Sequence, residues 1–292
     1  MQSYLDYRSS FLKGDTERDR GLATPDDITR EDDIRYAGHK DNVMDIYYPK
    51  GTEGLKPAIV SVHGGAWVSG SKETYQYYCM SLAQRGFTVV NCSYRLAPET
   101  VFPGSIEDIN KVFTWIMANG REHHIDTGNL FAVSDSSGAQ ITSQYAAILT
   151  NPGFAALFPF SAPEGLKLRA IALNCGVYDA KTYLLADSDA PIHYYVQDMS
   201  EANLEAMSTT KYITSSYPPS FIITANRDFL RKNAEPMHEL LKSQGVPSEL
   251  RIYGTDEKLL GHVFHLDIRN DTAVSCSDEE CAFFRSYLKE EA

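Results

Sequence analysis

Short apolar runs of strand length alternate with segments of helical periodicity along most of the chain. Runs of four to eight apolar residues predict buried strands, and apolar positions three and four apart predict helices that cover them. Strands are predicted at residues 57–63, 87–92, 130–133, 168–175, 218–225 and 250–253. Helices are predicted at residues 72–85, 105–119, 137–150, 230–243 and 278–289. The alternation predicts an α/β fold with a doubly wound, mostly parallel sheet of about eight strands, helices on both faces and a small cap.

Three segments depart from this alternation. Residues 33–49 read as two strands joined by a polar turn, which predicts an antiparallel hairpin at one sheet edge. Residues 177–217 are acidic, rich in tyrosine and without periodicity, and so long an excursion is usually a functional insertion or lid. Residues 1–30 are charged and compatible with a helix. They form either a solvated arm or a lid over a pocket, and the sequence does not decide between the two.

Length and composition fit a globular protein with a sizeable core. The 292 residues, 43% of them hydrophobic and 11% aromatic, could form one large domain or two small ones. We expect a single domain over residues 1–292, with cap elements at about 1–30 and 177–217. The net charge of −12 excludes nucleic acid, polyphosphate and anionic membranes as partners, because these need clustered Lys and Arg. A neutral or cationic small molecule fits better.

The lack of targeting and membrane-spanning segments predicts a cytoplasmic protein. The N-terminus has no apolar segment of signal-peptide length, and no later run approaches the roughly 18 apolar residues of a membrane span. The odd number of cysteines, without CxxC spacing, favours neither a disulfide framework nor a zinc site. We expect most of them to be small core residues: Cys79, Cys92, Cys175, Cys276 and Cys281.

A strand, a sharp turn and a helix meet at Ser136. In a small-x-Ser-x-Gly pattern such a turn strains the serine backbone and lifts its hydroxyl above the sheet edge. Ser134 occupies the position where glycine is usual, and Gly138 is retained. Serines at a strand end are also common as helix N-caps, so this pattern alone does not establish a nucleophile.

Three other strand ends carry groups that would complete a catalytic site: His63 with two glycines, Asp228 and His262. The carboxyl ends of parallel strands meet at one sheet edge, so these groups can approach Ser136. A serine hydroxyl needs an imidazole to accept its proton, and the imidazole needs a carboxylate to fix its tautomer. Asp228 could instead cap a helix, and Asp256 is a rival acid in a loop where charges are normally solvated.

Two further histidines have other expected roles. His265 could form a metal pair with His262, but no third ligand is evident, so we expect no metal and no cofactor. His63, beside Gly64, is expected to orient its loop and to take no part in acid-base chemistry.

The combined motifs resemble the α/β-hydrolases of the hormone-sensitive-lipase type over nearly the whole chain. The resembling segments are residues 63–67 (an HGG-x-W variant of the family's HGGG), 94–99 with 102–103, 135–138, 227–230 and 261–264. The resemblance implies Ser136 as nucleophile, His262 as general base and then acid, and Asp228 as the orienting carboxylate. It also implies an oxyanion hole built from the backbone N–H groups of Gly65, Ala66 and Ser137.

The family pattern also suggests a substrate pocket under the cap. Candidate acyl-pocket residues are Trp67, Tyr194, Tyr195 and Val263, and the tyrosines of the insertion, including Tyr178 and Tyr183, line either a pocket or the cap core. The expected function is a serine carboxylesterase that hydrolyses short-chain esters through an acyl-enzyme. An arylformamidase-type amidase and a non-catalytic ligand-binding protein are the alternatives. We expect a small-molecule ester as the partner and leave a homodimer open.

Overall fold

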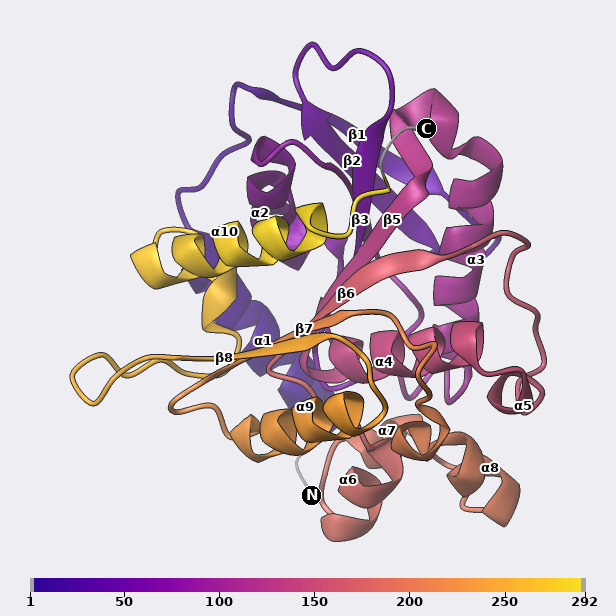
Figure 1. Cartoon of the computed structure of the whole chain (residues 1–292). Helices are drawn as coiled ribbons and strands as arrows, with labels where there is room; N and C mark the ends of the chain where they lie inside the picture. Colours follow the sequence, from indigo (N-terminus) through magenta and orange to yellow (C-terminus); the bar gives the residue numbers. More distant parts are fainter. Residues whose placement is uncertain (1–2, 290–292) are drawn as a thin grey trace.

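The computed structural model describes residues 3–289, which form an eight-stranded sheet in the order β1-β2-β4-β3-β5-β6-β7-β8 (Figure 1). The strands are β1 Ile28–Arg35, β2 Val43–Pro49, β3 Lys56–Val62, β4 Thr88–Cys92, β5 Ile125–Asp135, β6 Leu168–Asn174, β7 Ser220–Ala225 and β8 Ser248–Tyr253. The pairs β1–β2 and β2–β4 are antiparallel, and every later pair is parallel. The predicted mostly parallel sheet and its antiparallel edge hairpin are therefore confirmed.

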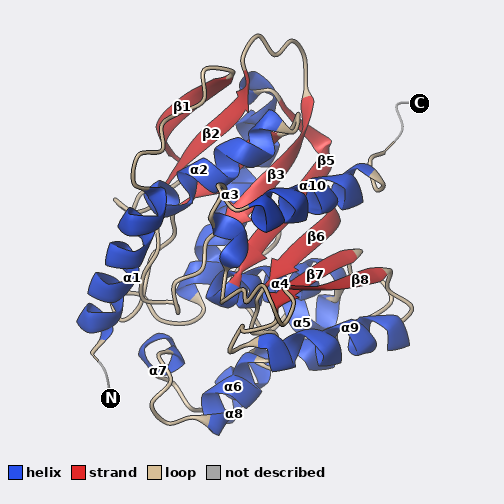
Figure 2. Ribbon diagram, turned by 90° about the vertical axis from the view of Figure 1, so that its left-hand side faces the viewer, coloured by secondary structure: helices blue, strands red, loops and turns tan. Residues whose placement is uncertain are grey.

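Helices cover both faces of this sheet (Figure 2). They are α1 Tyr4–Asp19, α2 Lys72–Gln84, α3 Gly104–Asn119, α4 Ser136–Thr150, α5 Pro152–Ala155, α6 Ala180–Ala186, α7 Ile192–Tyr195, α8 Glu201–Ala206, α9 Ala234–Ser243 and α10 Asp271–Arg285, with short 3-10 turns η1 Gly120–His123, η2 Thr209–Tyr212, η3 Arg231–Asn233 and η4 Phe264–Leu266. Apolar side chains of α3, α4 and α9 pack in the larger core cluster, and those of α2 and α10 pack in the other. The two clusters lie on opposite faces of the sheet.

The last helix begins seven residues earlier than the pattern predicts, at Asp271 instead of residue 278. Its first turns hold β-branched and polar residues, and its buried face includes Glu280, so an apolar stripe is hard to recognise. Tyr78 and Asn174 donate hydrogen bonds to the Glu280 carboxyl group, at 2.6 and 2.9 Å. Burial raises the pKa of Glu280 to about 7. Polar pairing to α2 and β6, which sequence periodicity does not reveal, thus adds to the apolar contacts that hold this helix in place.

The N-terminal segment and residues 177–217 both contain helices. Residues 177–217 hold α6, α7, α8 and η2, and no strand. The predicted arm at residues 1–30 divides into α1 and the start of β1. Helix α1 buries none of its side chains and is joined to the sheet domain by hydrogen bonds, among them those from Arg8 to the Val68 and Ala97 carbonyls at 2.7 and 2.9 Å.

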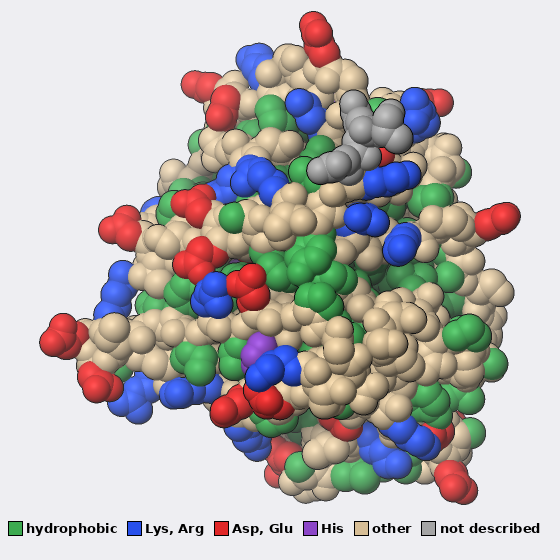
Figure 3. All heavy atoms as spheres, in the orientation of Figure 1, with side chains coloured by type: hydrophobic (Ala, Val, Ile, Leu, Met, Phe, Trp, Pro, Cys, Tyr) green, Lys and Arg blue, Asp and Glu red, His purple; other side chains and the backbone are tan. Residues whose placement is uncertain are grey.

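The remaining expectations concern cysteines, charge and membranes. All five cysteines are free and buried, which confirms them as core residues. Acidic and basic side chains are interspersed on the face drawn in Figure 3. Among residues 3–289, no helix is long and apolar enough to cross a membrane.

Candidate active site

Ser136 stands at the turn between β5 and α4 with a φ of +52°. This left-handed conformation costs a non-glycine residue about 1 kcal/mol, so the expected backbone strain is present. Gly138 is needed beside it, because a Cβ atom there would lie 2.3 Å from the Val62 carbonyl oxygen. Ser134 fits where glycine is usual, since it is buried and its hydroxyl donates to the Ala172 carbonyl at 3.4 Å.

His262 and Asp228 lie in hydrogen-bonding order beside this serine. The distance from His262 Nε2 to Ser136 Oγ is 3.0 Å, and that from His262 Nδ1 to Asp228 Oδ1 is 2.8 Å. The Asp228 side chain is fully buried, whereas 21% of the His262 side chain is exposed. The structure thus brings together three residues that come from the ends of β5 and β7 and from the loop after β8.

Hydrogen bonds hold Asp228 in its ionised form. Burial alone would raise the pKa of this carboxyl, but the hydrogen bonds from His262, from the Leu230 N–H and from Thr224 outweigh burial and lower it. The Leu230 N–H and the Thr224 hydroxyl donate at 2.9 and 2.8 Å. A fixed carboxylate of this kind selects the imidazole tautomer that carries its proton on Nδ1.

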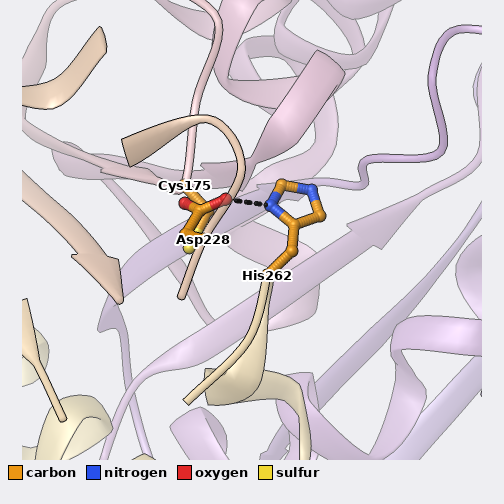
Figure 4. Close-up of side chains that lie close together, drawn as sticks. All are labelled: Cys175, Asp228 and His262. Carbon is orange, nitrogen blue, oxygen red and sulfur yellow. Dashed lines mark hydrogen bonds and ion pairs between the residues drawn. The ribbon is translucent and has the colours of Figure 1, made fainter. Parts of the chain in front are cut away.

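Cys175 is a further side chain at this edge, directly after β6 (Figure 4). Ligand atoms of Cys175, Asp228 and His262 lie within 4.8 Å of one another, the only such trio of potential metal ligands among residues 3–289. Asp228 and His262 are already hydrogen-bonded to each other, and burial raises the pKa of the Cys175 thiol. Asp228 and His262 are therefore better explained as hydrogen-bonded partners of Ser136, with a neutral Cys175 thiol beside them, than as ligands of a bound metal. His265 does not belong to it.

The loop after β3 brings backbone N–H groups to the same place. Gly65, Ala66 and Ser137 all border the cavity above Ser136. Gly65 has a φ of +123°, and a Cβ atom there would lie 2.1 Å from the Ser69 carbonyl oxygen. Ala66 adopts a φ of +54°. The alanine that replaces the family's third glycine thus keeps its backbone donor at the cost of about 1 kcal/mol of strain.

Asp135 and Tyr75 hold the Gly64 end of this loop. The Gly64 N–H donates to the Tyr75 hydroxyl at 2.9 Å and to Asp135 Oδ1 at 3.1 Å. The same hydroxyl donates to Asp135 Oδ2 at 2.8 Å. Burial raises the pKa of Asp135 to about 6, and the hydrogen bond from Tyr75 works in the opposite direction. Asp135 is thus a positioning residue that connects the nucleophile turn to the glycine loop.

Tyr75→Phe should make ester hydrolysis more sensitive to acid. Losing the hydroxyl removes a donor that lowers the Asp135 pKa, so a larger share of Asp135 is protonated near pH 6 and its hold on Gly64 weakens. We expect kcat/KM to fall about fivefold at about pH 8, and further at about pH 6. Tyr77→Phe on the same helix, whose hydroxyl donates to the Leu22 carbonyl, is the control. Equal losses at both pH values would contradict the positioning role.

His63 is buried beneath the glycine loop. Its Nδ1 lies 2.7 Å from the Gly64 carbonyl oxygen, and its ring stacks on that of Tyr94 at a centroid distance of 4.1 Å. Burial lowers the pKa of His63 to about 4. A neutral, enclosed imidazole fits the loop-orienting role predicted for His63 and Gly64.

A cavity of about 520 Å³ opens above Ser136 and His262. Of the predicted pocket residues, Trp67 and Val263 line it. Trp67 is held by a hydrogen bond from its Nε1 to Gln140 at 2.9 Å. Helix α1 supplies part of the wall through Tyr7, Phe11 and neighbouring residues, so the N-terminal segment borders the site.

Tyr194 and Tyr195, also predicted for this pocket, are not among the residues that line it. Tyr195 is fully buried, and its ring stacks on Trp67 from behind at a centroid distance of 6.0 Å. Tyr194 packs edge-on against Tyr4 of α1, at 5.6 Å. Tyr183 is the tyrosine of the insertion that reaches the cavity. The placement of Tyr194 and Tyr195 is corrected accordingly.

Several residues of the site were not identified from the sequence: Asp135 and Tyr75 as a pair, Cys175, Gln140 and Phe229. Cys175 follows a predicted strand, so its place at the sheet edge was available as a signal. Phe229 stands next to Asp228, and its ring lies 4.4 Å from that of His262. Tyr75 and Gln140 reach the site from within helices, which strand ends do not indicate.

Comparisons with known proteins relate this chain to esterases. The sequence model of the BD-FAE family matches residues 44–237. Carboxylesterase NlhH of Mycobacterium tuberculosis is 29% identical over 246 residues, which is 79% of this chain and 76% of that protein. Versiconal hemiacetal acetate esterase of Dothistroma septosporum is 29% identical, over 70% of this chain and 66% of that protein.

A solved structure shares the fold over almost the whole chain. Esterase B of Lactobacillus rhamnosis, in a C6-C4 SN3 inhibited form, superposes with a TM-score of 0.88 over 96% of this chain and 93% of its own. The two sequences are 22% identical, so this likeness concerns the fold.

Proposed function

The chain belongs to the BD-FAE family and is a carboxylic ester hydrolase of the α/β-hydrolase fold, and we propose that Ser136, His262 and Asp228 carry out its reaction on short-chain acyl esters. One observation carries the assignment of residues. The Ser136 hydroxyl, the His262 imidazole and the Asp228 carboxylate are joined by hydrogen bonds of 3.0 and 2.8 Å at the floor of a cavity.

The geometry supports the following course of reaction. His262 Nε2 accepts the Ser136 proton as the oxygen attacks the ester carbonyl, and Asp228 stabilises the imidazolium. The backbone N–H groups of Gly65, Ala66 and Ser137 stabilise the oxyanion. The imidazolium then protonates the leaving alcohol, which departs and leaves an acyl group on Ser136. Water, deprotonated by His262, releases the acid and restores the serine.

The proposed preference for short acyl chains rests on the aromatic side chains in the wall of the cavity. Trp67 and Tyr183 form part of its wall, and their rings lie 6.0 Å apart. While Tyr183 closes this wall, it limits the number of methylene groups that can be buried. In this proposal, α1 and residues 177–217 act as the cap, and the protein works in the cytoplasm without needing a membrane.

A substrate series tests the proposal. We expect hydrolysis of p-nitrophenyl acetate and butyrate, with a fall in kcat/KM of about tenfold or more toward octanoate. Phenyl formate and formanilide, which share their acyl group, test the amidase alternative in the same assay. Faster hydrolysis of formanilide than of phenyl formate would favour an arylformamidase. Inactivity toward every ester would contradict the proposed function and favour a binding role.

A further inference from the structure

A second cavity lies behind one wall of the active-site cavity. Its volume is about 390 Å³, and it is formed by the segment after β6, by α6 and by the segment from η3 to α9. Helices α6 and α9 lie close together on the same side of the sheet (Figures 1 and 2). Val177 and Tyr183 line both cavities. These two side chains therefore form the wall between the triad and the second cavity.

The surface of this second cavity suits an alkyl chain. Tyr178, Met237 and Leu240 line it, and the first two are only 3% and 2% exposed. Polar side chains also line it, and among them Asp179 accepts hydrogen bonds from the Thr182 N–H and the Thr210 hydroxyl at 2.8 and 2.7 Å. Buried apolar side chains such as Tyr178 and Met237 offer an alkyl chain a surface to pack against.

The two wall residues differ in their freedom to move. Val177 is buried, and its N–H donates to the Ser136 carbonyl at 3.3 Å, so it is tied to the nucleophile turn. Tyr183 is only partly buried and belongs to the seven-residue helix α6. Rotation of the Tyr183 side chain would join the two cavities without disturbing the triad. Tyr183 is thus the side chain that can close or open the wall.

We propose that the second cavity is a subsite for the distal part of a medium-length acyl chain, closed toward Ser136 by Tyr183. The inference rests on the proposed function, because it assumes an acyl group on Ser136. The acyl chain is the fitting occupant, since it is the substrate part that becomes bonded to Ser136, and Val177 of the wall is hydrogen-bonded to that residue.

Replacing Tyr183 with a smaller residue should shift the preference toward longer acyl chains. The test measures kcat/KM for p-nitrophenyl butyrate, octanoate, decanoate and laurate with the wild type, Tyr183→Ala and the control Tyr183→Phe, which keeps the ring. Each methylene group that becomes buried contributes about fourfold in kcat/KM. We expect the octanoate to butyrate ratio to rise about tenfold or more in Tyr183→Ala and to stay unchanged in Tyr183→Phe.

A second substitution distinguishes the new subsite from a mere enlargement of the first cavity. Leu240 of α9 lines the second cavity and does not line the first. Leu240→Trp should fill the second cavity, so Tyr183→Ala/Leu240→Trp should return the octanoate to butyrate ratio to within about twofold of the wild-type value. A raised ratio that persists in the double variant would overturn the proposal.

A folding measurement and a second variant keep the test decisive. Thermal unfolding shows whether each variant is folded, and Tyr183→Leu, a smaller change, replaces Tyr183→Ala if the latter does not fold. Normal hydrolysis of butyrate without a shift in any folded variant would overturn the subsite and leave the proposed function intact. A wild type inactive toward all esters would instead overturn the proposed function, and the subsite with it.

Discussion

Ser136→Ala should abolish ester hydrolysis, with kcat for p-nitrophenyl butyrate falling by roughly five to six orders of magnitude. The substitution removes the atom that attacks the carbonyl and leaves only binding and the oxyanion hole to assist water. Alanine tolerates the left-handed φ of +52° no better than serine does, so the folded state should lose little stability. A large loss of activity without a matching loss of thermal stability is the expected signature.

Ser143→Ala is the matched control for this variant. Ser143 lies on the same helix, is equally small and donates to the Gln140 carbonyl at 3.0 Å, away from the cavity. It should keep activity within about twofold. An organophosphate with a p-nitrophenyl leaving group gives a second readout, since it should phosphorylate the wild type on Ser136 and leave Ser136→Ala unlabelled. Retained activity, or a label on another residue, would contradict the nucleophile assignment.

The approach of Ser136, Asp228 and His262 could be predicted because topology brings them together. Each follows a predicted strand, and parallel strands place their carboxyl ends at one edge. The sheet order confirms that β5, β6, β7 and β8 are consecutive neighbours. Sequence separations of 126 and 34 residues therefore do not prevent hydrogen bonds of 3.0 and 2.8 Å. By the same reasoning, Cys175 at the end of β6 could have been anticipated.

Residues that enter the site from helices could not be placed in this way. Tyr75 lies within an amphipathic helix, where an aromatic residue is expected to face the core. Its hydroxyl reaches both Asp135 and Gly64 from α2, which packs mainly against β4 and β2. Such contacts depend on the distance between packed elements, which periodicity does not determine.

Residues 177–217 show more clearly that periodicity does not determine how side chains are placed. The α-helices of residues 177–217 are only four to seven residues long, too short for an apolar face to define their orientation. Tyr183, Tyr194 and Tyr195 are therefore equivalent in the sequence, yet only Tyr183 borders the cavity. The conformation of Ala66 was likewise not determined by its motif, because a methyl group makes a positive φ uncommon without forbidding it.

Asp228→Asn should lower kcat by about four orders of magnitude while leaving KM nearly unchanged. The asparagine amide can offer its NH₂ group to His262 Nδ1, which favours the tautomer that carries the proton on Nε2 and cannot accept one from Ser136. The lowered pKa of Asp228 means that the wild type has its carboxylate ionised throughout the neutral range. The loss should therefore not be recovered by raising the pH.

Asp256→Asn separates this role from a general effect of negative charge near the site. Asp256 lies in the exposed loop between β8 and η4 and is the other acid that the sequence offered for the triad. Removing one charge from either position changes the net charge equally, so a long-range electrostatic effect would weaken both variants alike. We expect Asp256→Asn to retain activity within about twofold. A comparable loss in both variants would remove Asp228 from the triad, because of the two carboxylates it is Asp228 that is hydrogen-bonded to His262.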